Sequence, residues 1–326
     1  MPEKDAKCIK CGKPAEVLLP YGPQAFCAEH FCSLIEARYG KTVRAFSLFP
    51  AGSKLLFAVS GGKDSLTALY LGQKFFSQRN KISALLIDEG VRGYRSKALA
   101  VAEKNCGEWG IPFTRISFRE EFGLSMDGIV KKMRSSEENL GSPCAFCGTL
   151  RRTLMNRYAR KLRADRLVTG HNLDDECQSI LMNSLDNDLP RFVRSGAVSG
   201  VKEFKGFVQR VKPLSEIPEH EIVLYASFKD IPFHFGERCP YRGEAKRNRF
   251  RTLLDELEES YPGSKHSLWN FFNEVKPLLL ESGKFSAAKL NSCTKCGSPA
   301  QGKECDACRK LRALKRPVRK KHGKKS

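Results

Sequence analysis

The sequence predicts an α/β protein with a doubly wound parallel sheet and a small Cys-rich module at each end of the chain. Two observations support this fold class. Between about Lys54 and Leu280, short aliphatic or β-branched runs alternate with segments of helical spacing, which is the order that βαβ units produce. Cysteine pairs separated by two residues lie near both termini, outside this alternating region.

The alternating region contains five expected strands and several helical patterns. The expected strands are Lys54–Val59, Ile82–Ile87, Phe113–Phe118, Arg166–Thr169 and Phe207–Lys212. The expected helices include Leu66–Phe76, Lys97–Trp109, Leu150–Leu162 and Asp175–Leu185. In a sheet of this kind, ligands bind just beyond the carboxyl ends of the strands, so the turns that follow the strands are where we expect functional residues.

Charge and composition restrict the class of protein. The 326 residues include 57 Lys and Arg against 36 Asp and Glu, and the net charge of +21 indicates a polyanionic partner such as nucleic acid. Ten of these basic residues lie between 309 and 326, a stretch without any acidic residue. No apolar run approaches the roughly 20 residues of a membrane helix, and the N-terminus lacks the apolar segment of a secretory signal. We therefore expect a cytoplasmic protein that does not enter a membrane.

Most of the thirteen cysteines follow the spacing of metal sites. Paired two-residue knuckles provide four ligands for a tetrahedral structural zinc ion, and each terminal segment is too short to build a core without one. The C-terminal quartet is Cys293, Cys296, Cys305 and Cys308. The N-terminal quartet is Cys8, Cys11, Cys27 and His30, with Cys32 as an alternative fourth ligand. Four protein ligands leave no open position, so neither site is expected to be catalytic.

A Gly-rich turn follows the first expected strand. Its residues are Ser60, Gly61, Gly62, Lys63, Asp64 and Ser65. A glycine pair between a strand and a helix permits close approach of phosphate, and the first N–H groups of the helix face the same point. The spacing is not that of a Walker A loop. Asp88 ends the neighbouring expected strand, where a carboxylate can bind a ribose or a base.

Two further motifs lie downstream. Cys144 and Cys147 precede the expected basic helix that carries Arg151 and Arg152, and a third cysteine, Cys239, is far along the chain. The expected strand Arg166–Thr169 is followed by a polar turn that contains Gly170, His171, Asp174 and Asp175. Either aspartate of this turn could hold Mg²⁺, His171 could contact phosphate or substrate, and Asp174 could also cap the next helix.

The Ser60–Ser65 stretch resembles the signature of the PP-loop pyrophosphatase superfamily. Together with the central cysteines and both terminal quartets, it is similar to the tRNA 2-thiouridine synthetase family over nearly the whole chain, from Cys8 to Cys308. The resemblance implies that ATP and Mg²⁺ bind at the Gly-rich turn, with Asp88 and the Gly170–Asp175 turn completing the site. It also implies adenylation of the C2 oxygen of a tRNA uridine, release of pyrophosphate and replacement of the oxygen by sulfur.

In that family the central cysteines carry an iron–sulfur cluster, so the resemblance implies that Cys144, Cys147 and Cys239 hold a [4Fe–4S] cluster with one iron open to sulfide. Sulfur would arrive on a ubiquitin-like carrier or as free sulfide, and a homodimer is expected. We expect Asp64, Asp174, Cys144 and Cys147 to be catalytic. Where the family often has a catalytic Lys, this chain has Arg151, whose permanent charge suits stabilisation of the adenylate rather than proton transfer.

Several alternatives stay open. Cys144 or Cys147 could instead act as a persulfide nucleophile, or the thiols could be structural. A lysidine synthase would share the Gly-rich turn without needing the three cysteines. A non-enzymatic zinc-ribbon RNA-binding protein would explain the charge and the termini only. The target could be the wobble uridine or the T-loop ribothymidine.

These interpretations divide the chain into four parts. Residues 1–45 form an N-terminal zinc finger, and residues 46–285 form the ATP-binding catalytic domain. Residues 286–310 form a C-terminal zinc finger, and residues 311–326 form a basic tail.

Overall fold

The computed structural model of the protein describes residues 6–136, 138–200, 206–235, 239–241, 246–285 and 290–314. Most of the predicted basic tail, residues 315–326, lies outside these ranges. Within the described ranges, we find no helix with the length and apolar character needed to cross a membrane.

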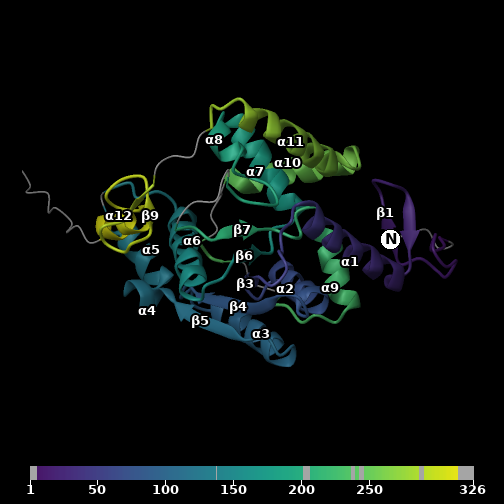
Figure 1. Cartoon of the computed structure of the whole chain (residues 1–326), viewed down its shortest axis with the longest axis horizontal. Helices are drawn as coiled ribbons and strands as arrows, with labels where there is room; N and C mark the ends of the chain where they lie inside the picture. Colours follow the sequence, from purple (N-terminus) through teal and green to yellow (C-terminus); the bar gives the residue numbers. More distant parts are fainter. Residues whose placement is uncertain are drawn as a thin grey trace, which may run out of the picture.

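A five-stranded parallel sheet forms the centre of the fold, in the order β5-β4-β3-β6-β7 (Figure 1). The strands are β3 (Lys54–Val59), β4 (Lys81–Asp88), β5 (Phe113–Ser117), β6 (Arg166–Thr169) and β7 (Gln209–Val211). The prediction of a parallel α/β sheet is confirmed, although β7 is shorter than expected. The chain order reverses between β3 and β6, so the turns after these two strands meet at one point, as in other doubly wound sheets.

Helices cover both faces of this sheet because side chains alternate along each strand. Leu55 and Phe57 of β3 face one hydrophobic cluster, and Leu56 faces the other. The first cluster includes residues of α1 (Ala28–Ala45), α2 (Lys63–Phe76), α3 (Arg95–Glu108) and α9 (Glu219–Phe228). The second includes residues of α4 (Phe118–Phe122), α5 (Met126–Arg134) and α6 (Pro143–Lys161).

A separate helical layer packs around α7 (Leu173–Leu185), which begins at the carboxyl end of β6 (Figure 1). It consists of α8 (Leu189–Phe192), α10 (Lys246–Ser260) and α11 (Ser264–Glu281). Trp269 and Phe272 of α11 are buried in the first cluster, so this layer shares the core of the sheet.

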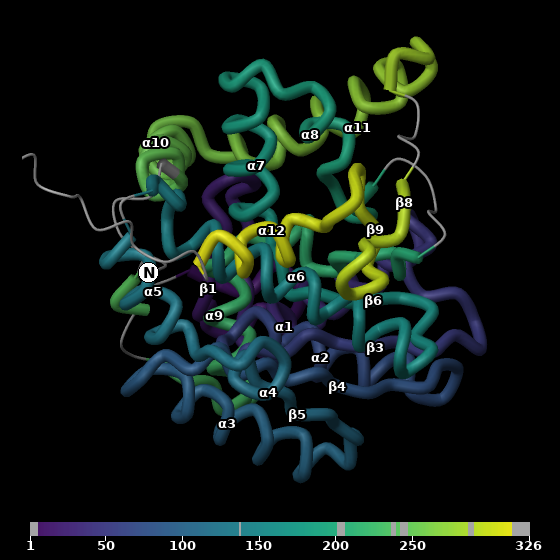
Figure 2. Tube along the Cα trace, turned by 90° about the vertical axis from the view of Figure 1, so that its left-hand side faces the viewer, coloured from purple at the N-terminus to yellow at the C-terminus, as the bar shows by residue number. Residues whose placement is uncertain are grey.

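The terminal modules lie on different parts of this core. The N-terminal module has a hairpin of β1 (Val17–Leu19) and β2 (Gln24–Phe26) and runs directly into α1. The C-terminal module pairs β8 (Asn291–Ser292) with β9 (Pro299–Ala300) and ends in α12 (Asp306–Ala313), which packs on α6 (Figure 2).

Two predictions about helix starts are wrong. Helix α6 begins at Pro143, because Ser142 caps it and proline suits the first turn, so Cys144 and Cys147 lie in the helix rather than before it. Helix α7 is capped by Asn172, whose side chain accepts a hydrogen bond from the Asp175 N–H. Asp174 is therefore not the cap.

Candidate active site

The nucleotide loop, Ser60–Ser65, connects β3 to α2. Gly61 has φ +82°, and a Cβ atom there would lie 1.9 Å from the Ala98 carbonyl oxygen, so only glycine fits. The hydroxyl of Ser65 accepts a hydrogen bond from the Ser60 N–H at 3.0 Å and donates to the Gly62 carbonyl at 3.0 Å, which fixes the loop. Gly62 caps α2 without a side-chain partner, leaving the N–H groups of the first turn available to an anion.

The turn after β6 touches this loop directly. A Cβ atom on Gly170 would lie 2.7 Å from backbone atoms of Asp64 and Ser65, so a glycine is needed where the two turns meet. Asn172 donates from its amide to Asp64 Oδ1 at 3.0 Å and binds the Asp175 N–H. Sequence reasoning assigned no role to Asn172, although its place in the polar turn signalled one.

Asp64 and Asp175 form a pair of half-buried carboxylates linked by Asn172. Burial raises the pKa of Asp64, and burial together with the negative charge of Asp64 raises the pKa of Asp175 to about 6. Lys63 lies 3.0 Å from Asp64, and Arg247 lies 3.1 Å from Asp175. The charge of Asp64 opposes the ionisation of Asp175, and two such neighbouring carboxylates could share a divalent cation.

Both carboxylate oxygens of Asp174 already have partners within the protein. Its Oδ1 accepts from Lys265 Nζ at 2.5 Å, and its Oδ2 accepts from the Glu219 N–H at 2.6 Å. Glu219 in turn binds Lys63 at 2.7 Å. Asp174 thus joins α7 to α9 and α11, and of the two candidate aspartates the geometry favours Asp175 as a metal ligand.

His171 lies beside the buried ion pair of Lys212 and Glu176, whose charged atoms are 2.6 Å apart. Its Nδ1 is 2.9 Å from Thr169 Oγ1. Burial and the positive charges of Lys212 and Arg210 hold the pKa of His171 well below its usual value, so the imidazole is neutral at pH 7. A neutral imidazole can donate one hydrogen bond to a substrate without adding charge.

The three central cysteines come together from two segments. Cys144 and Cys147 lie in the first turns of α6, and Cys144 Sγ is 3.3 Å from the Tyr241 carbonyl oxygen. The Tyr241 hydroxyl donates to Asp127 of α5 at 2.7 Å, which fastens the segment of Cys239 beside the pair. Burial and the nearby Glu89 raise the pKa of the Cys147 thiol to about 11. Iron–sulfur clusters are held by cysteine thiolates, ordinarily four, so three converging thiols could ligate three irons of a [4Fe–4S] cluster.

Arg151 connects the cysteines to the sheet edge. It lies one turn after Cys147, and its guanidinium is 3.6 Å from Glu89 Oε1. Glu89 is buried, and its other oxygen is 2.5 Å from Arg95, which also donates to the Ser60 carbonyl. Sequence reasoning missed Glu89, because a single carboxylate after a strand carries no signal of its partners.

Asp88 ends β4 close to these groups. Its Oδ1 accepts from the Gly90 N–H at 2.8 Å, and its Oδ2 is 3.4 Å from Arg115. The half-buried carboxylate therefore lies at the carboxyl end of the strand, as expected.

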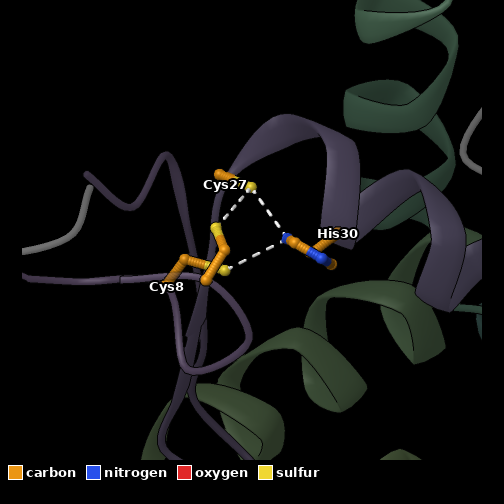
Figure 3. Close-up of side chains that lie close together, drawn as sticks. Cys8, Cys27 and His30 are labelled. Carbon is orange, nitrogen blue, oxygen red and sulfur yellow. Dashed lines mark hydrogen bonds between the residues drawn. The ribbon is translucent and has the colours of Figure 1, made fainter. Parts of the chain in front are cut away.

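Both terminal quartets are assembled. The ligand atoms of Cys8, Cys11, Cys27 and His30 lie within 4.8 Å of one another, as do those of Cys293, Cys296, Cys305 and Cys308. Figure 3 shows Cys8, Cys27 and His30 pointing toward a common centre. The ligand atoms converge with His30 and without Cys32, so His30 completes the N-terminal group. Soft, closed four-ligand groups fit structural zinc.

Comparisons with known proteins agree with this geometry. The PP-loop domain family matches residues 34–257, and the N-terminal LIM domain of the 2-thiouridine synthetase TtuA matches residues 7–32. The tRNA 2-thiolation protein NcsA of Haloferax volcanii is 34% identical over 322 residues, which cover 94% of this chain and 99% of that protein. The tRNA-5-methyluridine(54) 2-sulfurtransferase of Thermotoga maritima is 34% identical over 319 residues, with 98% and 99% covered.

A solved structure shows the same fold. The U34-tRNA thiolase NcsA from Methanococcus maripaludis with its [4Fe-4S] cluster has a TM-score of 0.79 and 30% identity, covering 94% of this chain and 96% of that chain. The predicted family and enzyme class are thereby confirmed. The chain belongs to the PP-loop tRNA 2-thiolation proteins and is a tRNA sulfurtransferase.

Proposed function

We propose that this chain uses ATP to adenylate the C2 oxygen of a tRNA uridine and then replaces that oxygen with sulfur. One observation carries the proposal. The carboxyl ends of β3, β4 and β6 bring the nucleotide loop, the Asp64–Asp175 pair and the Arg151–Glu89 pair to one edge of the sheet, beside the central cysteines. Under this proposal the adenylating site and the sulfur-bearing site are adjacent.

ATP would bind with its triphosphate on the nucleotide loop. The N–H groups of α2 and the ammonium of Lys63 offset phosphate charge. Asp64 and Asp175 would hold Mg²⁺, which supplies charge neutralisation for the departing pyrophosphate. Asp88 lies where a ribose or a base would rest, and neutral His171 donates to phosphate or to the substrate.

In the first step the C2 oxygen of the uridine attacks the α-phosphorus of ATP. An O–P bond forms, the bond to the bridging oxygen breaks, and pyrophosphate leaves. Arg151 stabilises the negative charge of the adenylate, and Glu89 aims its guanidinium. In the second step a C2–S bond forms and AMP departs with the original oxygen.

The [4Fe–4S] cluster would be held by Cys144, Cys147 and Cys239, whose thiols converge. No fourth cysteine is assigned to this group. The cluster, when bound, supplies an iron without a protein ligand for activation of sulfur. The alternative is a persulfide on the exposed Cys144. Iron and acid-labile sulfide in anaerobically purified protein distinguish the two, because a colourless and fully active preparation would leave only the persulfide.

The remaining assignments concern the substrate, the metals, the location and the partners. We propose tRNA as substrate, zinc in both terminal quartets, and a cytoplasmic location like that of the cytoplasmic tRNA 2-thiolation protein 1 of Bos taurus, which is 33% identical over 313 residues. A ubiquitin-like thiocarboxylate carrier or free sulfide would deliver the sulfur, and the protein would form a homodimer.

The proposal is tested by nucleoside mass spectrometry on unmodified tRNA incubated anaerobically with reconstituted protein, ATP, Mg²⁺ and sulfide. We expect a 2-thiouridine-type nucleoside, and its position separates the anticodon from the T loop. Asp64→Ala should abolish both pyrophosphate release and thiolation, whereas Cys239→Ala should lose thiolation and keep tRNA binding. If pyrophosphate release depends on tRNA but no sulfur is incorporated, the adenylation stands and the sulfur assignment is wrong.

A further inference from the structure

A large basic cavity lies between α6, β7, α7, α8 and the C-terminal module. Its volume is about 2300 Å³, well above the roughly 300–1,000 Å³ of small-molecule sites, so it suits a segment of a macromolecule. Figure 2 shows the C-terminal module in front of α6, with α7 and α8 above it. His171 and Arg247 line this cavity and also border the nucleotide site, so the cavity leads to the reaction site.

The cavity lining is crowded with positive charge. Arg152 of α6, Arg210 of β7 and Arg191 of α8 line it together. Burial and the charges of Arg151 and Arg191 lower the pKa of Arg152, and burial and Arg152 lower that of Arg210. Like charges held this close oppose one another, and a polyanion would relieve the repulsion.

Two phenylalanines, Phe207 and Phe285, interrupt this basic lining. Phe285 is partly buried against the first hydrophobic cluster. Phe207 lines the cavity and is 48% exposed, although its backbone is held firmly. The buried Asn156 donates to the Gly206 carbonyl at 2.9 Å and accepts from the Val208 N–H at 2.9 Å, so it clamps the chain on both sides of Phe207. Gly206 has φ +102°, and a Cβ atom there would approach Pro299 to 3.1 Å. A rigid backbone thus presents an exposed ring.

We infer that Phe207 is a stacking platform for an unpaired base of the tRNA loop, with the cavity arginines on the flanking phosphates. The inference rests on the proposed function and adds where the loop binds. An exposed aromatic ring among arginines is how proteins bind single-stranded nucleic acid, since every base has a face that stacks. A duplex has no free base face, so the platform selects the unpaired loop that contains the target uridine.

The test measures the dissociation constant of fluorescein-labelled unmodified tRNA by anisotropy, with the full-length protein. Phe207→Ala should weaken binding roughly 5- to 100-fold, the loss of one stacked base. Phe207→Leu should weaken it nearly as much, because leucine keeps apolar area without a π-face, and Phe207→Trp should restore it. Phe75→Ala is the matched control, because Phe75 is 44% exposed on α2, outside the cavity lining.

Two further measurements separate stacking from charge. The slope of log Kd against log salt concentration should be unchanged in Phe207→Ala. In Arg152→Gln its magnitude should fall by about one, which corresponds to the loss of one phosphate contact. Binding of a fully paired RNA duplex should not respond to Phe207→Ala. The melting temperature of each variant checks that the exposed substitutions leave the fold intact.

Three outcomes overturn the inference. One is tRNA affinity within twofold of wild type for Phe207→Ala, and another is full affinity for Phe207→Leu. The third is a Phe207→Ala variant that binds tRNA normally but loses thiolation only when a protein thiocarboxylate supplies the sulfur. That result would make the cavity a site for the sulfur-donor protein. All three outcomes concern variants of Phe207, whereas the proposed function is tested by thiolation with the wild-type protein. The two can therefore fail independently.

Discussion

The two terminal modules have similar ligand groups but different relations to the rest of the molecule. Cys8 and Cys27 of the N-terminal module belong to the same hydrophobic cluster as β3 and α2. Cys293 and Cys305 of the C-terminal module belong to the cluster on the opposite face, with the helix that carries Cys144 and Cys147.

Their polar contacts differ in the same way. Tyr21 and Arg38 of the N-terminal region enclose the carboxylate of Glu221, which is fully buried in α9. In the C-terminal module, Lys310 donates to the Ala145 carbonyl, between the two cysteines of α6. Pro299 lies near Gly206, where an added Cβ atom would approach it to 3.1 Å. Two similar ligand groups therefore lie in different surroundings. The first is part of the cluster that contains α1, α2 and α9, and the second borders the cysteine helix and the basic cavity.

The largest effect that tests this comparison comes from removing one ligand in each module. Cys8→Ser should lower the free energy of unfolding by several kcal/mol or prevent folding, because the segment that would bind the metal is part of the main core. Cys293→Ser should leave that transition in place and abolish thiolation. Thermal melts followed by circular dichroism, with zinc content measured in parallel, check both. Equal destabilisation by the two variants would contradict the distinction.

The second effect concerns the buried charge beside the N-terminal module. Arg38→Met leaves the Glu221 carboxylate without its 2.9 Å partner, and an uncompensated buried charge costs about 3–5 kcal/mol. The matched control is Arg312→Met, which removes a 3.0 Å pair with Glu304 at the surface of the C-terminal module and should cost about 0–1 kcal/mol. Urea unfolding measures both, and a similar cost for the two would show that the N-terminal contacts do not support the core.

The third variant, Asp175→Asn, is expected to stabilise the fold rather than destabilise it, because it removes a carboxylate from the proposed reaction site. The folded pKa of Asp175, about 6, is above its ordinary value of 3.8, so ionisation destabilises the metal-free fold as pH rises from about 4 to 6. Asp175→Asn should therefore raise stability at pH 7 by about 1–3 kcal/mol, and much less at pH 4. It should also abolish pyrophosphate release. Melting curves of metal-free protein at both pH values check the sign, and a destabilised variant at pH 7 would contradict it.

Much of the fold and part of the site could be predicted from the sequence. Strands β3 and β6 have the predicted bounds, because uninterrupted apolar runs in a parallel sheet end at turn residues that are visible in the sequence. The two quartets and the nucleotide loop were predictable because their spacing alone carries the chemistry.

Other features depend on contacts between distant segments. The choice between Asp174 and Asp175 depends on Lys265, 91 residues downstream of Asp174. The choice of His30 over Cys32 depends on which face of α1 meets the core, and the role of Glu89 depends on arginines from two other helices. Helix α6 begins before the expected helix because Ser142 caps it and proline is favoured in the first turn of a helix.

The smallest effect tests how the C-terminal module holds the cysteine helix. Lys310 Nζ donates to the Ala145 carbonyl at 2.8 Å and lies 4.8 Å from the centre of the Phe146 ring. Lys310→Met keeps the apolar stem but removes the hydrogen bond and the cation–π contact, a loss of about 1 kcal/mol. Amide exchange in the first two turns of α6 should then become about fivefold faster, because local opening is easier by that amount.

The control for this variant lies in the other module. Lys13→Met removes an exposed 4.0 Å pair with Glu29, which is worth little at the surface, so exchange throughout α1 and α6 should stay at the wild-type rate. Unchanged exchange in α6 for Lys310→Met would mean that the module rests on the helix without holding it. In that case the C-terminal module would act on the tRNA alone, through the basic cavity, and the position of Cys144 and Cys147 would be set by α5 and the sheet.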